Sequence, residues 1–166
     1  MIEERGLFDL LATELGRSGD MSFSVIAVRL TGAALLCGLI GFEREVVKNS
    51  AGLRTTMLIG LAAATYALIT LELISTPAVP QDALRVDPVR LVEAVTSGVA
   101  FLAAGLIVWA KGHVHGLTTG AGMWLSAAVG VSAGLGLWKI AMLATLAGLI
   151  VLAVLKAVQQ RMGLKE

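Results

Sequence analysis

Charged side chains gather in one short segment of an otherwise apolar chain. Glu43, Arg44, Glu45, Lys48 and Arg54 lie close together between two long apolar runs, although only 15% of the residues are charged. Carboxylates and guanidinium groups held out of water can pair with one another, bind ions or carry protons. We expect Glu43, Arg44, Glu45 and Arg54 to form an inner layer of ion pairs. A purely structural interpretation competes, because ion pairs at helix ends near water contribute at most about 1 kcal/mol.

A second set of ionisable residues lies within or beside the other apolar runs. Arg29 is inside the first run, Glu72 is near the end of the second, and Asp87, Arg90 and Glu93 surround the beginning of the third. We expect the two arginines to face the three carboxylates in an outer layer. Three acids against two bases leave one carboxylate for a cation or a proton to complete. Glu72, Asp87 and Glu93 are therefore candidate metal ligands.

The composition indicates that these charges belong to a membrane protein. Of 166 residues, 57% are hydrophobic and 19 are glycine, and the mean hydropathy is +0.84, well outside the range of soluble domains. A net charge of +1 provides no basic surface, which excludes nucleic-acid binding. The single cysteine, Cys37, cannot form an intramolecular disulfide. The sequence contains no phosphate-binding loop and no hydrolytic grouping, so we do not expect an enzyme.

Five segments are long and apolar enough to cross a bilayer as helices. The hydrocarbon layer is about 30 Å thick and takes about 20 helical residues to span. Asp87-Pro88 is a helix-start signal just ahead of the third segment. The expected fold class is all-α, a polytopic membrane protein with five transmembrane helices in residues 23–158. The segments are Phe23 to Phe42, Leu53 to Ile74, Val89 to Trp109, Gly116 to Leu137 and Lys139 to Val158.

The distribution of lysine and arginine predicts the orientation of these helices. Residues 1–22 carry leucines at helical spacing and are expected to form an amphipathic segment, either on the membrane surface or folded onto the bundle. Residues 159–166 are expected to be a short cytoplasmic tail. The positive-inside rule places the N-terminus outside and the C-terminus in the cytoplasm. Basic residues on the cytoplasmic side are Arg44, Lys48, Arg54, Lys111, Lys156, Arg161 and Lys165, against Arg5, Arg17, Arg85, Arg90 and Lys139 on the other.

Small residues four positions apart mark faces on which helices can pack closely. In lipid, helix association depends on such close packing, because no hydrophobic effect drives it. The faces predict tight contacts either inside one chain or between subunits, and a homo-oligomer, with a dimer favoured, is one of the two alternatives. The rows are Ala33, Cys37 and Gly41; Gly116 and Gly120; and Gly130 and Gly134.

Several short motifs, taken in order, resemble the MgtC/SapB family of bacterial inner-membrane proteins. The resemblance runs from about Arg29 to the end of the fifth segment. It includes a helix-start motif formed by Gly116, Leu117, Thr118 and Thr119. The other motifs are Gly38-Leu39-Ile40-Gly41-Phe42-Glu43-Arg44-Glu45, Ala51-Gly52-Leu53-Arg54-Thr55, Asp87-Pro88-Val89-Arg90, Phe101-Leu102 and Trp124.

The resemblance implies a multi-pass protein of the bacterial inner membrane that is linked to magnesium homeostasis and to adaptation to low magnesium or acid. It also implies Mg²⁺ as a candidate ligand, and for some members binding to another membrane protein such as the ATP synthase. Long members end in a soluble cytoplasmic domain. This sequence departs from the family pattern at Ala94, where glutamine is common, and at Ala100 and Ala103, which replace glycines. Those departures argue against carrying a residue-level mechanism through the third segment.

Two functions therefore remain as alternatives. The first is a membrane module that transports or senses divalent cations, with the outer carboxylates as ligands. The second is a regulatory membrane protein whose small-residue faces dock against another membrane complex. Both place the protein in a lipid bilayer, and they differ in whether ions or a partner protein contact the working residues.

Overall fold

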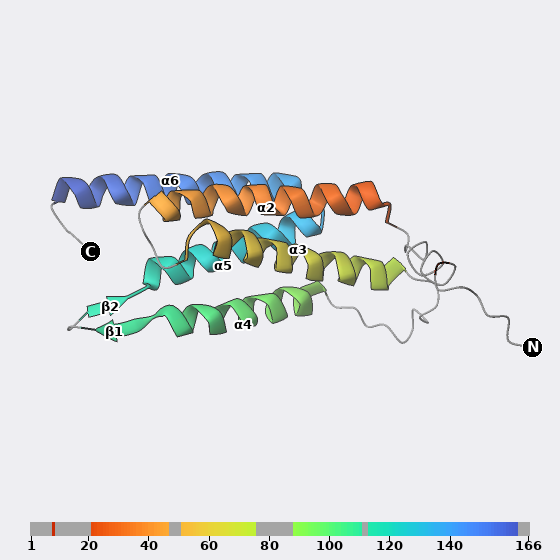
Figure 1. Ribbon diagram of the computed structural model, residues 1–166, viewed down its shortest axis with the longest axis horizontal. Coiled ribbons are helices and arrows are strands. Elements are labelled where there is room, and N and C mark those ends of the chain that lie inside the picture. The colour runs from red at the N-terminus through yellow and green to blue at the C-terminus, as the bar shows by residue number, and fades with distance from the viewer. Residues whose placement is uncertain (1–7, 9–20, 47–50, 76–87, 111–112, 163–166) are drawn as a thin grey trace, which may run out of the picture.

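The computed structural model describes residues 8, 21–46, 51–75, 88–110 and 113–162, and within them five long helices run alternately in opposite directions (Figure 1). We name one end of this bundle the start face, where α2, α4 and α6 begin, and the other the end face, where those three helices finish. The helices are α2 (Phe23–Val46), α3 (Leu53–Ser75), α4 (Pro88–Leu106), α5 (Leu117–Gly134) and α6 (Trp138–Met162).

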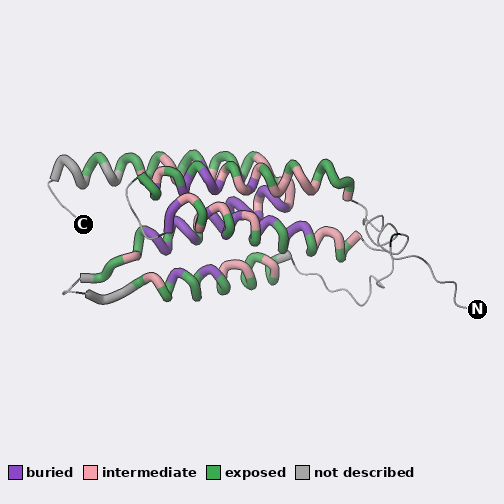
Figure 2. Tube along the Cα trace, in the orientation of Figure 1, coloured by how far each residue is buried: buried purple, intermediate pink, exposed green. Residues whose placement is uncertain are grey.

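Helix α5 is the centre of the bundle. It contacts all four other helices, and buried residues are concentrated along it and along the faces turned toward it (Figure 2). Val129 and Ala133 pack with residues of α2, α3 and α6 on one side. Met123 and Ala127 pack with residues of α3 and α4 on the other side. The core is therefore two clusters separated by α5.

The glycines of α5 let α3 approach its backbone. A Cβ atom at Gly130 would collide with the backbone of Gly60, and one at Gly134 would collide with the backbone of Ala64. Close approach of this kind gives dispersion contacts along two whole helix faces, which is what stabilises helix pairs in lipid.

The other small-residue rows also pack within one chain. Cys37 lies against Gly60 of α3, and a Cβ atom at Gly120 would lie 3.1 Å from the Cβ atom of Ala103. Of the two predicted kinds of contact, inside one chain or between subunits, members of each row thus form the first. Gly98 and Gly105 of α4, in contrast, have no atom within 4 Å of an added Cβ atom.

Three of the helices are long and apolar enough to cross a membrane. These are α2, α3 and residues Val89–Leu106 of α4, with Trp138–Val154 as a shorter apolar stretch of α6. Large apolar side chains such as Phe42, Leu58 and Phe101 are exposed on their outer faces, as expected of surfaces that meet lipid. The molecule is therefore a helical membrane protein, and the five crossings and their orientation stay predictions.

Helix α5 is absent from that set because its sequence is unusually rich in glycine, serine and threonine. A helix enclosed by other helices does not need an apolar surface, and small residues serve its close contacts better. Ser126 and Ser132 satisfy their hydroxyl groups within the helix by donating to the carbonyl groups of Gly122 and Ala128.

The expected boundaries were wrong at the end of the third segment. The helix stops at Leu106, and a short antiparallel hairpin follows, formed by β1 (Val108–Ala110) and β2 (His113–His115), with Trp109 opposite Val114. Gly105 weakens the helix, and residues 107–109 are two β-branched residues and a tryptophan, types that favour strands. The hairpin is thus a small addition to the expected all-α fold.

Two other helices are longer than expected. Helix α2 continues beyond Phe42 to Val46, and α6 continues beyond Val158 to Met162. Glu43, Arg44 and Glu45 therefore belong to the last turn of α2. Of the predicted amphipathic segment, only Phe8, Met21 and Ser22 fall within the described residues, and residues 163–166 of the tail fall outside them.

Candidate functional site

Arg44 is the buried charge of the end face. Its side chain follows Cys37, Ile40 and Gly41 on the inward face of α2, because these positions recur at helical spacing. Only 7% of its surface is exposed. Its Nη2 donates to the carbonyl oxygen of Thr118 at 3.2 Å. Extension of α2 to Val46 thus carries a guanidinium group into the contact with α5.

Glu43 and Arg44 form a close but incompletely satisfied pair. The Nε of Arg44 lies 3.8 Å from the Oε2 of Glu43, too far for a hydrogen bond. Both atoms are buried, and neither has a hydrogen-bond partner in the part of the chain that the structure describes. A buried polar atom without a hydrogen-bond partner destabilises the fold. A water molecule or an ion bound at this pair would supply the partner that each atom lacks.

Glu45 connects α2 to α3. Its Oε2 accepts a hydrogen bond at 3.0 Å from the backbone N–H of Leu53, the first residue of α3. A carboxylate at a helix N-terminus satisfies a free donor and is favoured by the helix dipole. Gly52 makes this contact possible, because a Cβ atom there would overlap the carboxylate.

Arg54 has a different environment from the other members of the predicted inner layer. Its side chain is exposed on the first turn of α3, and it forms no ion pair with another described residue. The structure thus brings Glu43, Arg44 and Glu45 into the contacts between helices and leaves Arg54 outside them.

The helix-start motif meets Arg44 on the end face. Gly116 precedes α5 with φ of 88°, and a Cβ atom there would collide with the carbonyl oxygen of Leu106. Leu117 is exposed, Thr118 accepts the hydrogen bond from Arg44, and Thr119 is buried. The motif and the charged segment are far apart in sequence, so only the tertiary structure shows that they form one site.

Sequence reasoning expected Cys37 to pack against another helix but did not identify Thr56 or Ser126 as part of the same interior. Cys37 Sγ donates to the carbonyl oxygen of Ser126 at 3.2 Å, and Thr56 lies against Gly41. The Oγ1 of Thr56 lies 3.1 Å from the carbonyl oxygen of Gly52, to which it donates. A small hydroxyl or thiol inside an apolar helix was the available signal, since such residues face protein more often than lipid.

Arg29 lies on the start face and contacts the end of α5. Its Nη1 donates to the carbonyl oxygen of Gly134 at 3.0 Å and lies 3.6 Å from the Sδ of Met21. Helix α5 ends there in a tight turn, with Gly136 at φ of 78° and Leu137 N–H bonded to Ser132. A cation beside free carbonyl groups at a helix C-terminus is favourable, so Arg29 supports this turn.

The other members of the predicted outer layer belong to α3, to α4 and to a position that the structure does not describe. Arg90 and Glu93 are exposed on α4, both carboxylate oxygens of Glu72 are buried, and Asp87 lies outside the described residues. No ion pair joins Arg29 or Arg90 to Glu93 within the described ranges. These ranges also hold no group of three or more His, Cys, Asp or Glu side chains suited to a metal. The outer layer and its metal ligands stay a prediction.

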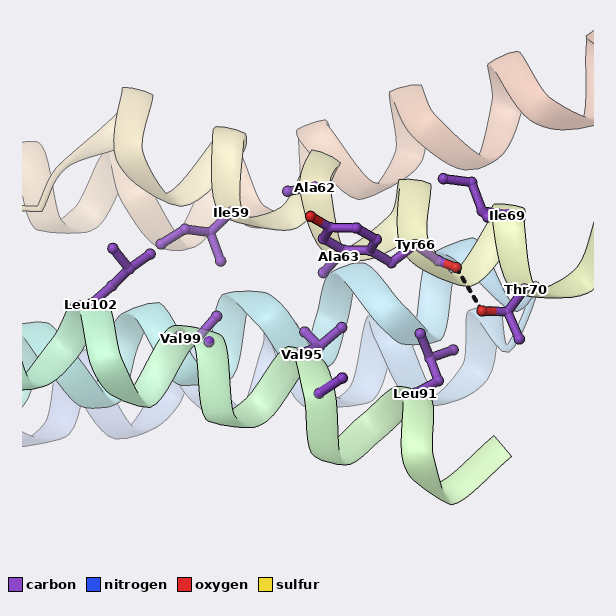
Figure 3. A pocket seen from close by; sticks show the side chains of 12 residues that line it. Ile59, Ala62, Ala63, Tyr66, Ile69, Thr70, Leu91, Val95, Val99 and Leu102 are labelled. Atoms are coloured by element: carbon purple, nitrogen blue, oxygen red, sulfur yellow. Dashed lines mark hydrogen bonds between the residues drawn. The ribbon is translucent and has the colours of Figure 1, made fainter. Parts of the chain in front are cut away.

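An apolar groove of about 520 Å³ separates α3 from α4. Tyr66 of α3 and Leu91 and Val95 of α4 are among the residues that line it (Figure 3). Thr70 donates to the backbone carbonyl group of Tyr66 and adds no free polar group. The phenolic hydroxyl group of Tyr66 is the other polar side-chain group among the lining residues, so the groove suits a mainly apolar occupant.

Comparison with known proteins identifies the family of this chain. A model of the MgtC family matches residues 30–161 of this chain. This chain belongs to the MgtC family. The match includes the whole end-face site, whereas Arg29 lies just before it. No solved structure matches the chain.

Several curated bacterial proteins are similar to this family member. YhiD of Escherichia coli K12, named as a candidate magnesium transporter, is 38% identical over 104 residues, which are 63% of this chain and 48% of YhiD. Protein MgtC of Brucella abortus is 43% identical over 105 residues, covering 63% of this chain and 40% of that protein. Protein MgtC of Salmonella typhimurium is 38% identical over 104 residues, covering 63% and 41%. The chain thus spans less than half the length of these relatives.

Proposed function

We propose that this protein is a magnesium-linked component of the bacterial inner membrane that senses or transports divalent cations. Membership of the MgtC family and the name of YhiD support the link to magnesium. The observation that carries the proposal is the buried Oε2 of Glu43, an acceptor without a hydrogen-bond partner in the described structure, beside a buried arginine.

The geometry of Glu43 suits a hydrated cation. Mg²⁺ keeps several of its water molecules and is usually bound through one or two carboxylates. A water ligand of the ion can donate to the Oε2 of Glu43, and the positive charge weakens the attraction between Glu43 and Arg44. Because Arg44 also binds the carbonyl oxygen of Thr118, a change at Glu43 is transmitted to the beginning of α5. This connection favours sensing over conduction.

Cation binding is tested on the full chain in lipid nanodiscs, by melting temperature with MgCl₂ and with KCl at equal ionic strength. We expect Mg²⁺ to raise the melting temperature of the wild type and of the control variant Glu93→Gln, which replaces an exposed carboxylate. We expect no such increase in Glu43→Gln. If Glu72→Gln and Glu93→Gln lose the effect and Glu43→Gln keeps it, the ligands are the outer carboxylates.

Magnesium flux into proteoliposomes separates transport from sensing. Flux above that of empty liposomes supports transport, and flux equal to them together with Mg²⁺ stabilisation supports sensing. Absence of both effects contradicts the proposal.

A second candidate function is a regulatory protein that binds another membrane complex, such as the ATP synthase. The groove between α3 and α4 supports it, because Ala94 and Gly98 on its wall permit close approach of a foreign helix. A photo-crosslinker at Gly98 is expected to capture the partner, while one at exposed Leu143 of α6 is not. Capture of a second copy of the chain would instead support the homo-oligomer, and capture of lipid alone from both positions contradicts this candidate.

A further inference from the structure

A second, smaller groove lies on the start face beside Arg29. It has a volume of about 280 Å³ and runs between the first turns of α2 and the beginning of α6. Its lining combines a cation, a hydroxyl group, an indole ring and two valines, contributed by Ser24, Val25, Val28, Arg29 and Trp138. The residues of α2 that line it precede the part of the chain matched by the MgtC family.

Arg29 carries a charge that no described carboxylate balances. Its hydrogen-bond partners among the described residues are the carbonyl oxygen of Gly134 and the sulfur of Met21, both uncharged. A guanidinium group has five N–H donors, so donors remain after these two contacts. Charged side chains at membrane depth pair with one another or with backbone carbonyl groups. Arg29 has one such carbonyl group, and its remaining donors are open to an anion.

The surroundings of the groove also favour an anion. The first turns of α2 and α6 contain no acidic residue, and the exposed Lys139 follows Trp138 at the beginning of α6. Backbone N–H groups at the beginning of a helix add further positive potential. Arg29, Lys139 and the two helix N-termini each contribute positive potential, which the C-terminus of α5 beside Arg29 offsets in part.

The apolar part of the groove indicates which anion fits. Val25 and Val28 line it beside the indole of Trp138, whose six-membered ring also packs against Gly32. Indole rings are favoured where the headgroup region meets the acyl chains. A free phosphate ion would make no apolar contacts with these side chains, whereas a phospholipid has an apolar region directly beside its phosphate group.

We propose that this groove binds an anionic phospholipid, with its phosphate group on Arg29 and Ser24 and its glycerol and upper acyl region on Val25, Val28 and Trp138. Arginine and phosphate form short, charge-assisted hydrogen bonds. Ser24 supplies a hydroxyl group that is otherwise bonded to Ser22 on the exposed surface at 3.0 Å. The site is independent of the magnesium function proposed above and lies at the opposite end of α2.

Quenching of Trp138 fluorescence by brominated lipids tests this site in the full chain. Trp109→Phe and Trp124→Phe leave Trp138 as the single indole, and the protein is reconstituted with brominated phosphatidylglycerol or brominated phosphatidylcholine. We expect stronger quenching by phosphatidylglycerol, loss of that preference in Arg29→Gln, and its retention in Arg54→Gln, which changes an exposed arginine on the end face. Equal quenching by the two lipids in the wild type overturns the proposal.

Two further measurements keep the test decisive if Arg29→Gln does not fold. Val28→Asp alters a side chain that is 60% exposed and places a carboxylate in the groove, so it should remove the lipid preference without loss of packing. A preference that survives in folded Val28→Asp contradicts the site. Added inorganic phosphate should leave the quenching unchanged, and if phosphate abolishes the preference, the groove binds a free anion and not a lipid.

Discussion

At the scale of the residue, the burial of Arg44 distinguishes it from the nearby Arg54. Arg44 lies between Glu43 and Thr118 with 7% of its surface exposed, while Arg54 points outward from the first turn of α3. The same charge can therefore contribute to stability at one position and very little at the other, because water screens an exposed charge and not a buried one.

Replacement of each arginine by methionine tests this difference. Arg44→Met removes the charge-assisted bond to Thr118 and leaves Glu43 without its counter-charge, and we expect a loss of about 2 kcal/mol in the free energy of unfolding. Arg54→Met should change it by less than about 0.5 kcal/mol. Unfolding in detergent micelles by titration with sodium dodecyl sulfate measures both values.

A double substitution checks the cause of the loss. In the double variant Arg44→Met with Glu43→Gln, an uncharged amide replaces the buried carboxylate. No buried charge is then left without a counter-charge, so part of the stability lost in Arg44→Met should return. If the two losses simply add, the ion pair does not explain the effect of Arg44→Met.

At the scale of the element, α5 is a helix adapted to contact other helices. Its glycines face α3 at backbone distance, whereas Gly98 on α4 faces open space. The two helices share a similar abundance of small residues but use them differently, because α5 is surrounded and α4 borders the groove.

A glycine-to-alanine substitution on each helix is expected to have opposite effects. Gly130→Ala places a methyl group against the backbone of Gly60, and overpacking of this kind costs about 1–3 kcal/mol. Gly98→Ala meets no atom within 4 Å and should stabilise the helix by about 0.5–1 kcal/mol. Melting temperatures of the purified variants in micelles show the sign, and an equal effect of both substitutions would contradict the packing described for α5.

At the scale of the whole molecule, alternation of the helices places two charged regions at opposite ends. Arg29 and the groove beside it lie near the beginning of α2, and Glu43, Arg44 and Glu45 lie near its end, beside the beginning of α5. Figure 1 shows that the two ends of α2 lie at opposite ends of the bundle. If all five helices cross the bilayer, the two faces meet different compartments.

Cysteine labelling measures this topology on a Cys37→Ala background. We expect a membrane-impermeant maleimide to label Ser22→Cys and Arg90→Cys in intact cells, and Arg54→Cys and His115→Cys only after lysis. The reverse pattern would keep the five crossings and invert the orientation. Labelling of all four positions from one side would contradict five crossings.

The amino-acid sequence by itself determined the class of the protein and the beginning of each helix to within one residue, but among the helix ends only that of α3. Lipid imposes long apolar helical segments, so α3 was predicted to within one residue, and the prolines and Asp87-Pro88 marked the beginning of α4. The end of α4 was not predicted, because the hydropathy of residues 107–109 suits a helix in lipid as well as a strand. Their pairing with β2, which hydropathy does not reveal, decides between these two structures.

Only the tertiary structure decided which charges work together. The rotation of α2 about its axis and its length to Val46 turn Arg44 inward and bring it to Thr118, and the turn after Gly134 gives Arg29 a carbonyl group as its partner instead of a described carboxylate. Helix rotation depends on the close packing of small residues against a particular neighbour. A sequence shows that such packing is available, but the neighbour is chosen by all five helices together.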